Sequence, residues 1–132
     1  MFNKVIQIGR LTAEPELKHS MADKPYVRAT LAVNRRYKDK RGDREADFIP
    51  IILWGRQAEL LTDFAGKGSL VSVEGEMRTR RYEKDGEIRT AVEVVCQHFQ
   101  MLESKAQREL REGGPKDPDL ADLILGEEDL PF

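Results

Sequence analysis

The sequence contains one cysteine, Cys96, two histidines and no hydrophobic run long enough to cross a membrane as a helix. A transmembrane helix needs about 18 consecutive apolar residues, so none is expected. A single cysteine cannot form an internal disulfide, and the first residues lack the features of a secretory signal. Together these two absences predict a reducing, cytoplasmic location. Only His19 and His98 accompany Cys96, so no metal-ligand spacing can be assembled, and we expect neither a metal nor a cofactor.

The composition predicts one compact domain with a strongly charged surface. Of the 132 residues, 39% are hydrophobic and 35% are charged, which is enough for one core but not for two. The net charge of −2 conceals a segregation, because residues 113–132 carry one basic and six acidic side chains, which leaves +3 for residues 1–112. A basic body with an acidic tail is frequent among nucleic-acid-binding proteins, and a plain soluble surface with a solubilising tail fits the charge equally well.

Several segments alternate apolar and polar residues with a period of two, as strands with one buried face do. Val71 and Val73, for example, oppose Ser72 and Glu74. This pattern predicts five strands, over residues 3–11, 26–37, 47–54, 69–82 and 88–97. Pro50 lies inside the third of them and requires an edge or a bulge there, because proline cannot donate to a strand ladder. Tight turns are expected at Arg41-Gly42-Asp43 and Lys84-Asp85-Gly86.

One helix is expected between the third and fourth strands. The segment from Gln57 to Phe64 places Leu60 and Leu61 at helical spacing with Phe64, and glycines at positions 66 and 68 end it. A second helix is plausible over residues 103–112, beyond which the sequence turns to glycine, proline and acidic residues. Such a composition cannot bury enough apolar surface to fold, so residues 113–132 are expected to be largely disordered.

The order of three strands, one short helix and two strands predicts the fold class. The prediction is all-β: an OB-fold, which is a five-stranded Greek-key barrel with one short helix, plus a disordered acidic C-terminal tail. An SH3-like barrel is the competing architecture. That barrel usually lacks a two-turn helix between its third and fourth strands, so the order of elements favours the OB-fold.

Strand parity places large aromatic residues on the expected outer face of the third strand. Ile51 and Leu53 share one face, whereas Phe48 and Trp54 share the other, about 20 Å apart at ~3.3 Å per residue. Exposed rings of this size are costly unless they bind something, and nucleobases stack on them. Alternatively, an isolated tryptophan in a strand is simply buried. The remaining phenylalanines are assigned to the core or to an interface: Phe2, Phe64 and Phe99.

Basic residues accompany aromatic ones in two further places. Arg78, Arg80 and Tyr82 share a face of the fourth strand, where guanidinium groups suit phosphates beside a stacked base. Tyr37 has the parity of the core residues, so it must turn outward to join such a site. Its cluster at the end of the second strand comprises Arg35, Arg36, Tyr37, Lys38 and Lys40. Each arginine alone is equally typical of a solvated face, but the joint pattern favours binding of single-stranded nucleic acid.

A series of short motifs runs through residues 1–104 and ends in an acidic tip at residues 127–132. They are Asn3 to Leu11, Glu14 to Leu17, Trp54 to Glu59, Lys67 to Ser69, Val73 to Gly75, Arg78 to Arg80 and Glu127 to Phe132. In this order they resemble the bacterial single-stranded DNA-binding protein (SSB) family, and the acidic tip is the most specific match. The short stretch between body and tip resembles the short paralogue that some transformable bacteria carry beside a longer protein.

The resemblance implies a non-enzymatic homotetramer that coats single-stranded DNA without sequence specificity. It implies four stacking positions per chain, which fall on Tyr37, Phe48, Trp54 and Tyr82. Other members often have tryptophan at three of these positions and phenylalanine in place of Trp54, an exchange that keeps the stacking chemistry. The basic positions that match the family's DNA contacts are Lys40, Arg56, Lys67, Arg78, Arg80 and Arg81.

The resemblance also implies that the acidic tip is a docking peptide for replication, recombination and repair proteins. Its docking residues are Asp129, Leu130, Pro131 and Phe132. A partner can take the Phe132 ring into an apolar pocket, and Pro131 limits the entropy lost on docking. The implied organisation is a DNA-binding OB-fold over residues 1–104, a short linker over 105–126 and the tip over 127–132, acting in the cytoplasm on the nucleoid and on no membrane.

Two other functions compete with DNA coating. One is an OB module of the primosomal type that binds proteins and holds DNA only weakly, but those proteins lack the terminal Asp-Leu-Pro-Phe. The other is a small nuclease, which needs a histidine–carboxylate constellation, a phosphate-binding loop or a metal cluster. No such pattern is found in the sequence.

Overall fold

The structure is a computed structural model that describes residues 1–104, 107 and 110. Met1–Met101 form one compact unit, and Leu102–Phe132 are divided from it as a second. In the second unit, Ser104 and Gln107 exchange hydrogen bonds: the Gln107 amide donates to the Ser104 hydroxyl, and the Ser104 amide to the Gln107 side-chain oxygen. This reciprocal pair is typical of a helix start. Most of the helix expected over 103–112, the linker, the acidic tail and the tip lie outside the described residues.

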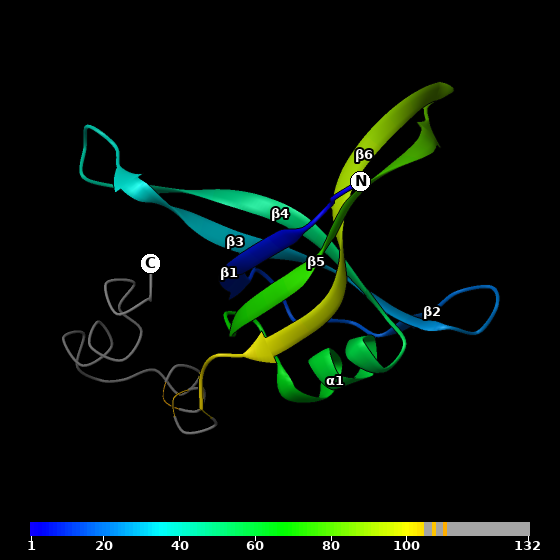
Figure 1. The fold of residues 1–132 in the computed structure, drawn as a ribbon, viewed down its shortest axis with the longest axis horizontal. Coiled ribbons are helices and arrows are strands. Elements are labelled where there is room, and N and C mark those ends of the chain that lie inside the picture. The colour runs from blue at the N-terminus through cyan, green and yellow to red at the C-terminus, as the bar shows by residue number, and fades with distance from the viewer. Residues whose placement is uncertain (105–106, 108–109, 111–132) are drawn as a thin grey trace. The chain divides into compact units, whose positions relative to one another are not determined.

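The chain forms a closed five-stranded barrel, which confirms the expected OB-fold (Figure 1). In sheet order the barrel runs β1-β5-β6-β4-β3 and closes by pairing of β3 with β1, while the short β2 extends the edge of β3. All pairings are antiparallel except that of β4 with β6. The elements are β1 (Val5–Leu11), β2 (Lys18–His19), β3 (Pro25–Lys38), β4 (Arg44–Trp54), α1 (Arg56–Phe64), β5 (Leu70–Lys84) and β6 (Glu87–Met101).

The core follows the predicted parity. Ile51 and Leu53 of β4 are buried, and Ile49 packs against the same cluster from a partly buried position. Ile52 has the opposite parity and is nevertheless buried, because it lies beside Arg28 of β3 on one side and Val95 of β6 on the other. The buried core cluster comprises Leu11, Val27, Leu31, Ile51, Leu53, Ala58, Leu61, Ala65, Val71, Val73, Val94 and Cys96.

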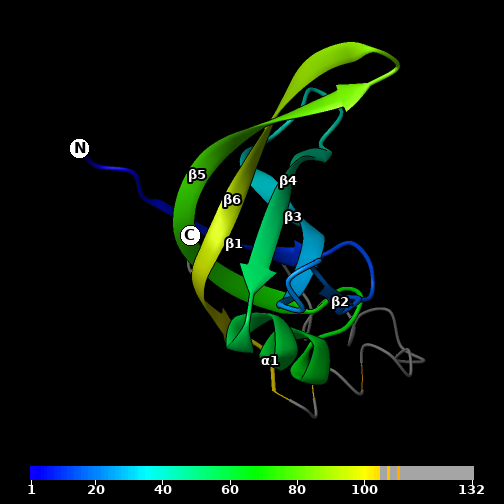
Figure 2. The same cartoon turned by 90° about the vertical axis from the view of Figure 1, so that its right-hand side faces the viewer.

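Helix α1 lies between the third and fourth barrel strands, at the position that favours the OB-fold over the SH3-like barrel. It lies across one end of the barrel, opposite the turn that joins β5 to β6 (Figure 2). Ala58 and Leu61 face the core, whereas Phe64 is exposed at the last turn. Phe2 is also exposed, and Phe99 packs against the core. A core position is therefore wrong for Phe2 and Phe64, and their role at an interface stays a prediction.

Two long hairpins extend away from the barrel in different directions (Figure 1). The β5–β6 ladder continues to Lys84 and Glu87, where Asp85 and Gly86 both have positive φ, as a tight turn of the mirror-image type requires. The β3–β4 ladder continues to the Lys38–Arg44 pair. Since β4 meets β6 only at Ile51 and Ile52, it has a single neighbour at Pro50, which confirms the edge expected there.

Candidate nucleic-acid interface

The four rings expected to stack are exposed to solvent. Phe48 and Trp54 lie on the outer face of β4, with 65% and 41% of their surface exposed, so the alternative of a buried tryptophan is wrong for this chain. Tyr37 and Tyr82 lie on the two extended hairpins and are 83% and 36% exposed. Exposed aromatic side chains on neighbouring strands provide flat faces on which bases stack.

Trp54 has an aromatic neighbour that the sequence did not reveal. Tyr26 is paired with Trp54 across the β3–β4 ladder, and the two ring centroids are 5.1 Å apart with the planes inclined by 35°. Cross-strand aromatic pairs of this kind hold each other's rotamers. Tyr26 opens its strand next to a proline, and only the register with β4 could have identified it as a member of the site.

The ladder between β3 and β4 explains how Tyr37 turns outward. Its register shifts between Asn34 and Lys38, so Tyr37 lies in an irregular stretch where strict strand parity no longer applies. The same hairpin carries Lys40 in its turn. There the Asp39 carboxylate accepts hydrogen bonds from the backbone amides of Arg41 and Asp43, which orders the loop.

Arg35, the first residue of the basic cluster at the end of β3, is paired with two carboxylates. It donates to both carboxylate oxygens of Asp47 and pairs with Glu45 at 3.0 Å. The hydrogen bond with Asp47 raises the pKa of Arg35, and the same bond lowers the pKa of Asp47 below its usual range. Two carboxylates therefore compensate this guanidinium, which lowers the local positive potential at the base of the β3–β4 hairpin.

The β5–β6 hairpin brings together Arg78, Arg80 and Tyr82. The Arg80 guanidinium lies 5.3 Å from the centre of the Tyr82 ring, within the range of a cation–π contact. Arg78 donates to Glu76, and this bond lowers the pKa of the Glu76 carboxyl. Arg81 has neither a hydrogen bond nor an ion pair within the described part of the chain, so its charge is fully available.

The remaining basic candidates are spread over the barrel. Arg56 is the first residue of α1 and pairs with Glu59 at 3.3 Å, close in sequence to Trp54. In Figure 1 the loop from α1 to β5 lies at the end of the barrel away from the β5–β6 turn, and this loop contains Lys67. Its backbone amide donates to the Glu14 carboxylate. The expected contacts thus do not form one compact patch but follow the length of the barrel and both hairpins.

The described residues contain no group of histidine, cysteine and carboxylate side chains placed to hold a metal ion. Within the same residues, no helix is long and apolar enough to cross a membrane. Burial raises the pKa of the Cys96 thiol to about 11, which keeps it protonated and unreactive. The exposed rings and arginines described above offer ring stacking and guanidinium hydrogen bonding.

A barrel of this topology with rings and arginines along its outer strands defines the oligonucleotide-binding class of OB-fold proteins. Residues 2–102 match the model of the single-strand binding protein family, and the chain belongs to this family. It is 55% identical to single-stranded DNA-binding protein 1 of Streptococcus pyogenes serotype M6, over the whole of both chains.

Two further relatives show which lengths occur among similar proteins. Single-stranded DNA-binding protein 2 of Streptococcus agalactiae serotype V is 56% identical, again over the whole of both chains. The single-stranded DNA-binding protein of Streptococcus pneumoniae serotype 4 is 44% identical over 115 residues, which cover 86% of this chain and 74% of the relative. The family thus includes members that extend beyond the match and members of this chain's own length.

Proposed function

We propose that this protein binds single-stranded DNA without sequence specificity, by base stacking and phosphate contacts, and protects it. The observation that carries the proposal is the exposure of Phe48 and Trp54 on the outer face of β4, beside a core that aliphatic residues already fill. The names of the similar streptococcal proteins support it. Every base has an aromatic face, so stacking of this kind tolerates all sequences.

The proposed division of labour follows the two chemistries. The stacking residues are Tyr37, Phe48, Trp54 and Tyr82, and Tyr26 supports Trp54 from the neighbouring strand. The phosphate-binding residues are Lys40, Arg56, Lys67, Arg78, Arg80 and Arg81. No bond of the DNA is made or broken in this function, since binding alone accounts for every residue assigned.

Titration of the intrinsic fluorescence with oligo(dT) tests the function. Trp54 is the only tryptophan in the sequence, so a base stacked on it quenches the entire tryptophan signal. We expect strong quenching by oligo(dT) and by single strands of mixed sequence, and little by a duplex of the same length. An unchanged spectrum, together with unchanged anisotropy of a labelled oligo(dT), would show that the protein does not bind single strands.

We also propose that four copies assemble through apolar residues that the isolated chain leaves exposed. Phe2 and Ile6 at the start of the chain and Phe64 of α1 are exposed side chains with no polar role. Light scattering after gel filtration measures the assembly, and a mass of one chain would contradict it.

The third part of the proposal concerns recruitment and is independent of the other two. Residues 1–104 would form the DNA-binding domain, 105–126 a linker and 127–132 the tip that docks replication, recombination and repair proteins. Asp129 and its acidic neighbours suit a basic surface on the partner, and the Phe132 ring suits an apolar pocket. The place of action would then be the nucleoid in the cytoplasm, where single strands arise.

A further inference from the structure

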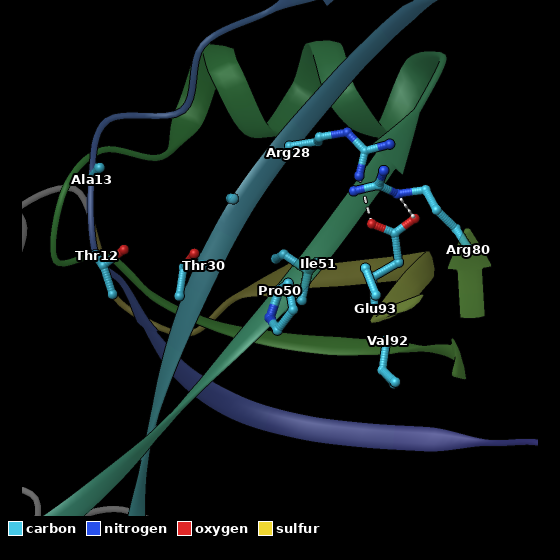
Figure 3. Close-up of a pocket in the computed structure, with 11 residues that line it drawn as sticks. Thr12, Ala13, Arg28, Thr30, Pro50, Ile51, Arg80, Val92 and Glu93 are labelled. Atoms are coloured by element: carbon cyan, nitrogen blue, oxygen red, sulfur yellow. Dashed lines mark hydrogen bonds and ion pairs between the residues drawn. The ribbon is translucent and has the colours of Figure 1, made fainter. Parts of the chain in front are cut away.

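A hollow of about 330 Å³ is lined by residues of β3, β4, β5 and β6 and by the loop that follows β1 (Figure 3). Arg28 of β3, Arg80 of β5 and Glu93 of β6 lie at one end of it. Thr12 and Thr30 carry hydroxyl groups at the other end. Apolar atoms of Pro50 and Ile51 lie between the two ends, and Val92 lies next to Glu93. The hollow thus combines a cationic end, a hydroxyl end and an apolar floor.

Glu93 joins two arginines that come from different hairpins. Arg28 Nη1 donates to Glu93 Oε2 at 2.5 Å, and Arg80 Nε lies 3.7 Å from Glu93 Oε1. The Glu93 side chain is only 10% exposed, whereas both arginine side chains are 44% exposed. One carboxylate on the buried side therefore holds two guanidinium groups. The cluster keeps a net charge of +1, with free N–H donors toward the solvent.

The dimensions and chemistry of the hollow match one unit of a nucleic-acid strand. Its volume lies at the lower end of the range for small-ligand pockets, about 300–1,000 Å³, so it has room for a single nucleotide unit. Two guanidinium groups fixed side by side suit the oxygens of one phosphate. The ring of Pro50 and the methyl groups of Val92 offer an apolar surface to the sugar and base.

We propose that this hollow is a nucleotide subsite for the bound strand, in which Arg28 and Arg80 hold one backbone phosphate and Glu93 positions both of them. The proposal rests on the proposed function and extends it by a phosphate ligand, Arg28, and a positioning residue, Glu93. Arg80 also contacts the Tyr82 ring, so the subsite continues directly into the stacking surface of the β5–β6 hairpin.

The positioning role of Glu93 predicts an effect on DNA affinity that is opposite to the one simple electrostatics predicts. Removing a negative charge from a DNA-binding face ordinarily strengthens binding, because fewer carboxylates repel the phosphates. If Glu93 positions the arginines, its neutral and isosteric replacement releases both guanidinium groups and weakens binding instead. Glu87 offers a matched control, because it pairs with Arg89 on the same hairpin at 3.6 Å but lies outside the hollow.

The experiment compares binding of a labelled oligo(dT) by the full chain and by four variants over a series of salt concentrations. Glu93→Gln is expected to weaken binding roughly threefold or more, whereas Glu87→Gln leaves it equal or slightly tighter. Arg28→Met is expected to weaken binding roughly tenfold and to reduce the salt slope by about 0.7, the contribution of one phosphate on a single strand. Lys24→Met, which removes one charge in the turn before β3, is expected to change neither.

Three outcomes decide the matter. An Arg28→Met variant that binds like Lys24→Met, while the unaltered protein binds oligo(dT), overturns the subsite and leaves the proposed function standing. Tighter binding by Glu93→Gln overturns the positioning role. Failure of the unaltered protein to bind overturns the proposed function and the subsite with it. If Glu93→Gln does not fold, as judged by circular dichroism, the arginine variant with an oligomer of abasic nucleotides still measures the phosphate contact.

Discussion

Tyr26 and Trp54 face each other across two antiparallel strands, with ring centroids 5.1 Å apart and planes inclined by 35°. One face of the Trp54 ring is thereby supported from within the protein, and 41% of the residue stays exposed. A ring held in one rotamer would lose little further entropy if a base stacks on it, so under the proposed function the pair is organised for binding in advance. The pairing with Tyr26 thus supports an exposed tryptophan on the outer face of β4.

The first prediction concerns the stacking role of Trp54. Trp54→Ala should lose ~1–3 kcal/mol of affinity for oligo(dT), the range known for base stacking in single-strand binding proteins themselves. Stability should fall by about 0.5–1.5 kcal/mol for the lost contact with Tyr26, plus the burial of the covered part of the ring, without loss of the fold, because the ring is not part of the core cluster. Anisotropy of a labelled oligomer and urea unfolding measure the two quantities. Trp54→Phe is the control and should keep most of the affinity, whereas an unfolded Trp54→Ala variant would mean that the ring is structural.

The second prediction concerns the phosphate-binding role of Arg81. Arg81→Met should reduce the salt slope of oligo(dT) binding by about 0.7, because Arg81 has no partner in the described part of the chain. The measurement is the affinity at several salt concentrations. Lys24→Met is the control for loss of one charge away from the hairpins. A slope that Arg81→Met leaves unchanged would remove Arg81 from the set of phosphate contacts.

The third prediction concerns pH and follows from the burial of Cys96. Its pKa is raised from 9.0 to about 11, so the unfolded chain loses the thiol proton first as the pH rises. The contribution of this group to stability is therefore complete below pH 9 and declines between pH 9 and about 11. Other groups also titrate there, so the comparison is between unaltered protein and Cys96→Ala in urea unfolding at each pH. Parallel curves for the two proteins would contradict the prediction. Alkylation should be slow in native protein and fast in urea.

The fourth prediction tests the tip. Deletion of Asp129 to Phe132, or Phe132→Ala alone, should abolish or greatly weaken capture of a recombination mediator or helicase, because one buried aromatic anchor usually dominates a small interface. Affinity for oligo(dT) should stay equal or rise slightly, since an acidic segment competes with DNA for basic residues. A pull-down and the anisotropy assay give both answers. Undiminished capture by Phe132→Ala would show that another segment docks the partners.

Much of the fold could be predicted because its signals are local. The alternation of Val71 and Val73 with polar residues predicted a strand. The helical spacing of Leu60 and Leu61 from Phe64 predicted α1, and the place of this helix in the order of elements favours the OB-fold. β2 escaped prediction because it has two polar residues, Lys18 and His19, which show no alternation and are strand only through pairing with β3. The strands of the two hairpins run further than expected, since their ladders continue where hydrophobic alternation stops, whereas β1 begins two residues later than expected, at Val5.

The site was predictable only so far as it depends on parity. The outward position of Phe48 and Trp54 follows from a period of two, and their exposure in the structure confirms it. Partners on other strands do not follow from the sequence. Arg35 meets Asp47 only because of the β3–β4 register. Arg28 meets Glu93 only because β3 and β6 both pair with β4 at Ile52. Such contacts depend on how the strands pair in space, which no local sequence pattern reveals.

The short contact between β4 and β6 has a consequence for how the barrel opens. Only Ile51 with Val94 and Ile52 with Val95 join these strands, whereas the β5–β6 ladder runs from Val71 to Lys84. Local opening of a barrel begins where the fewest backbone hydrogen bonds must break, so amide hydrogens along this seam should exchange with solvent before those of the β5–β6 ladder. A DNA strand that contacts both Arg28 and Arg80 would cross the seam between β4 and β6. Binding of DNA in the hollow should then slow hydrogen exchange at the four residues that join these strands.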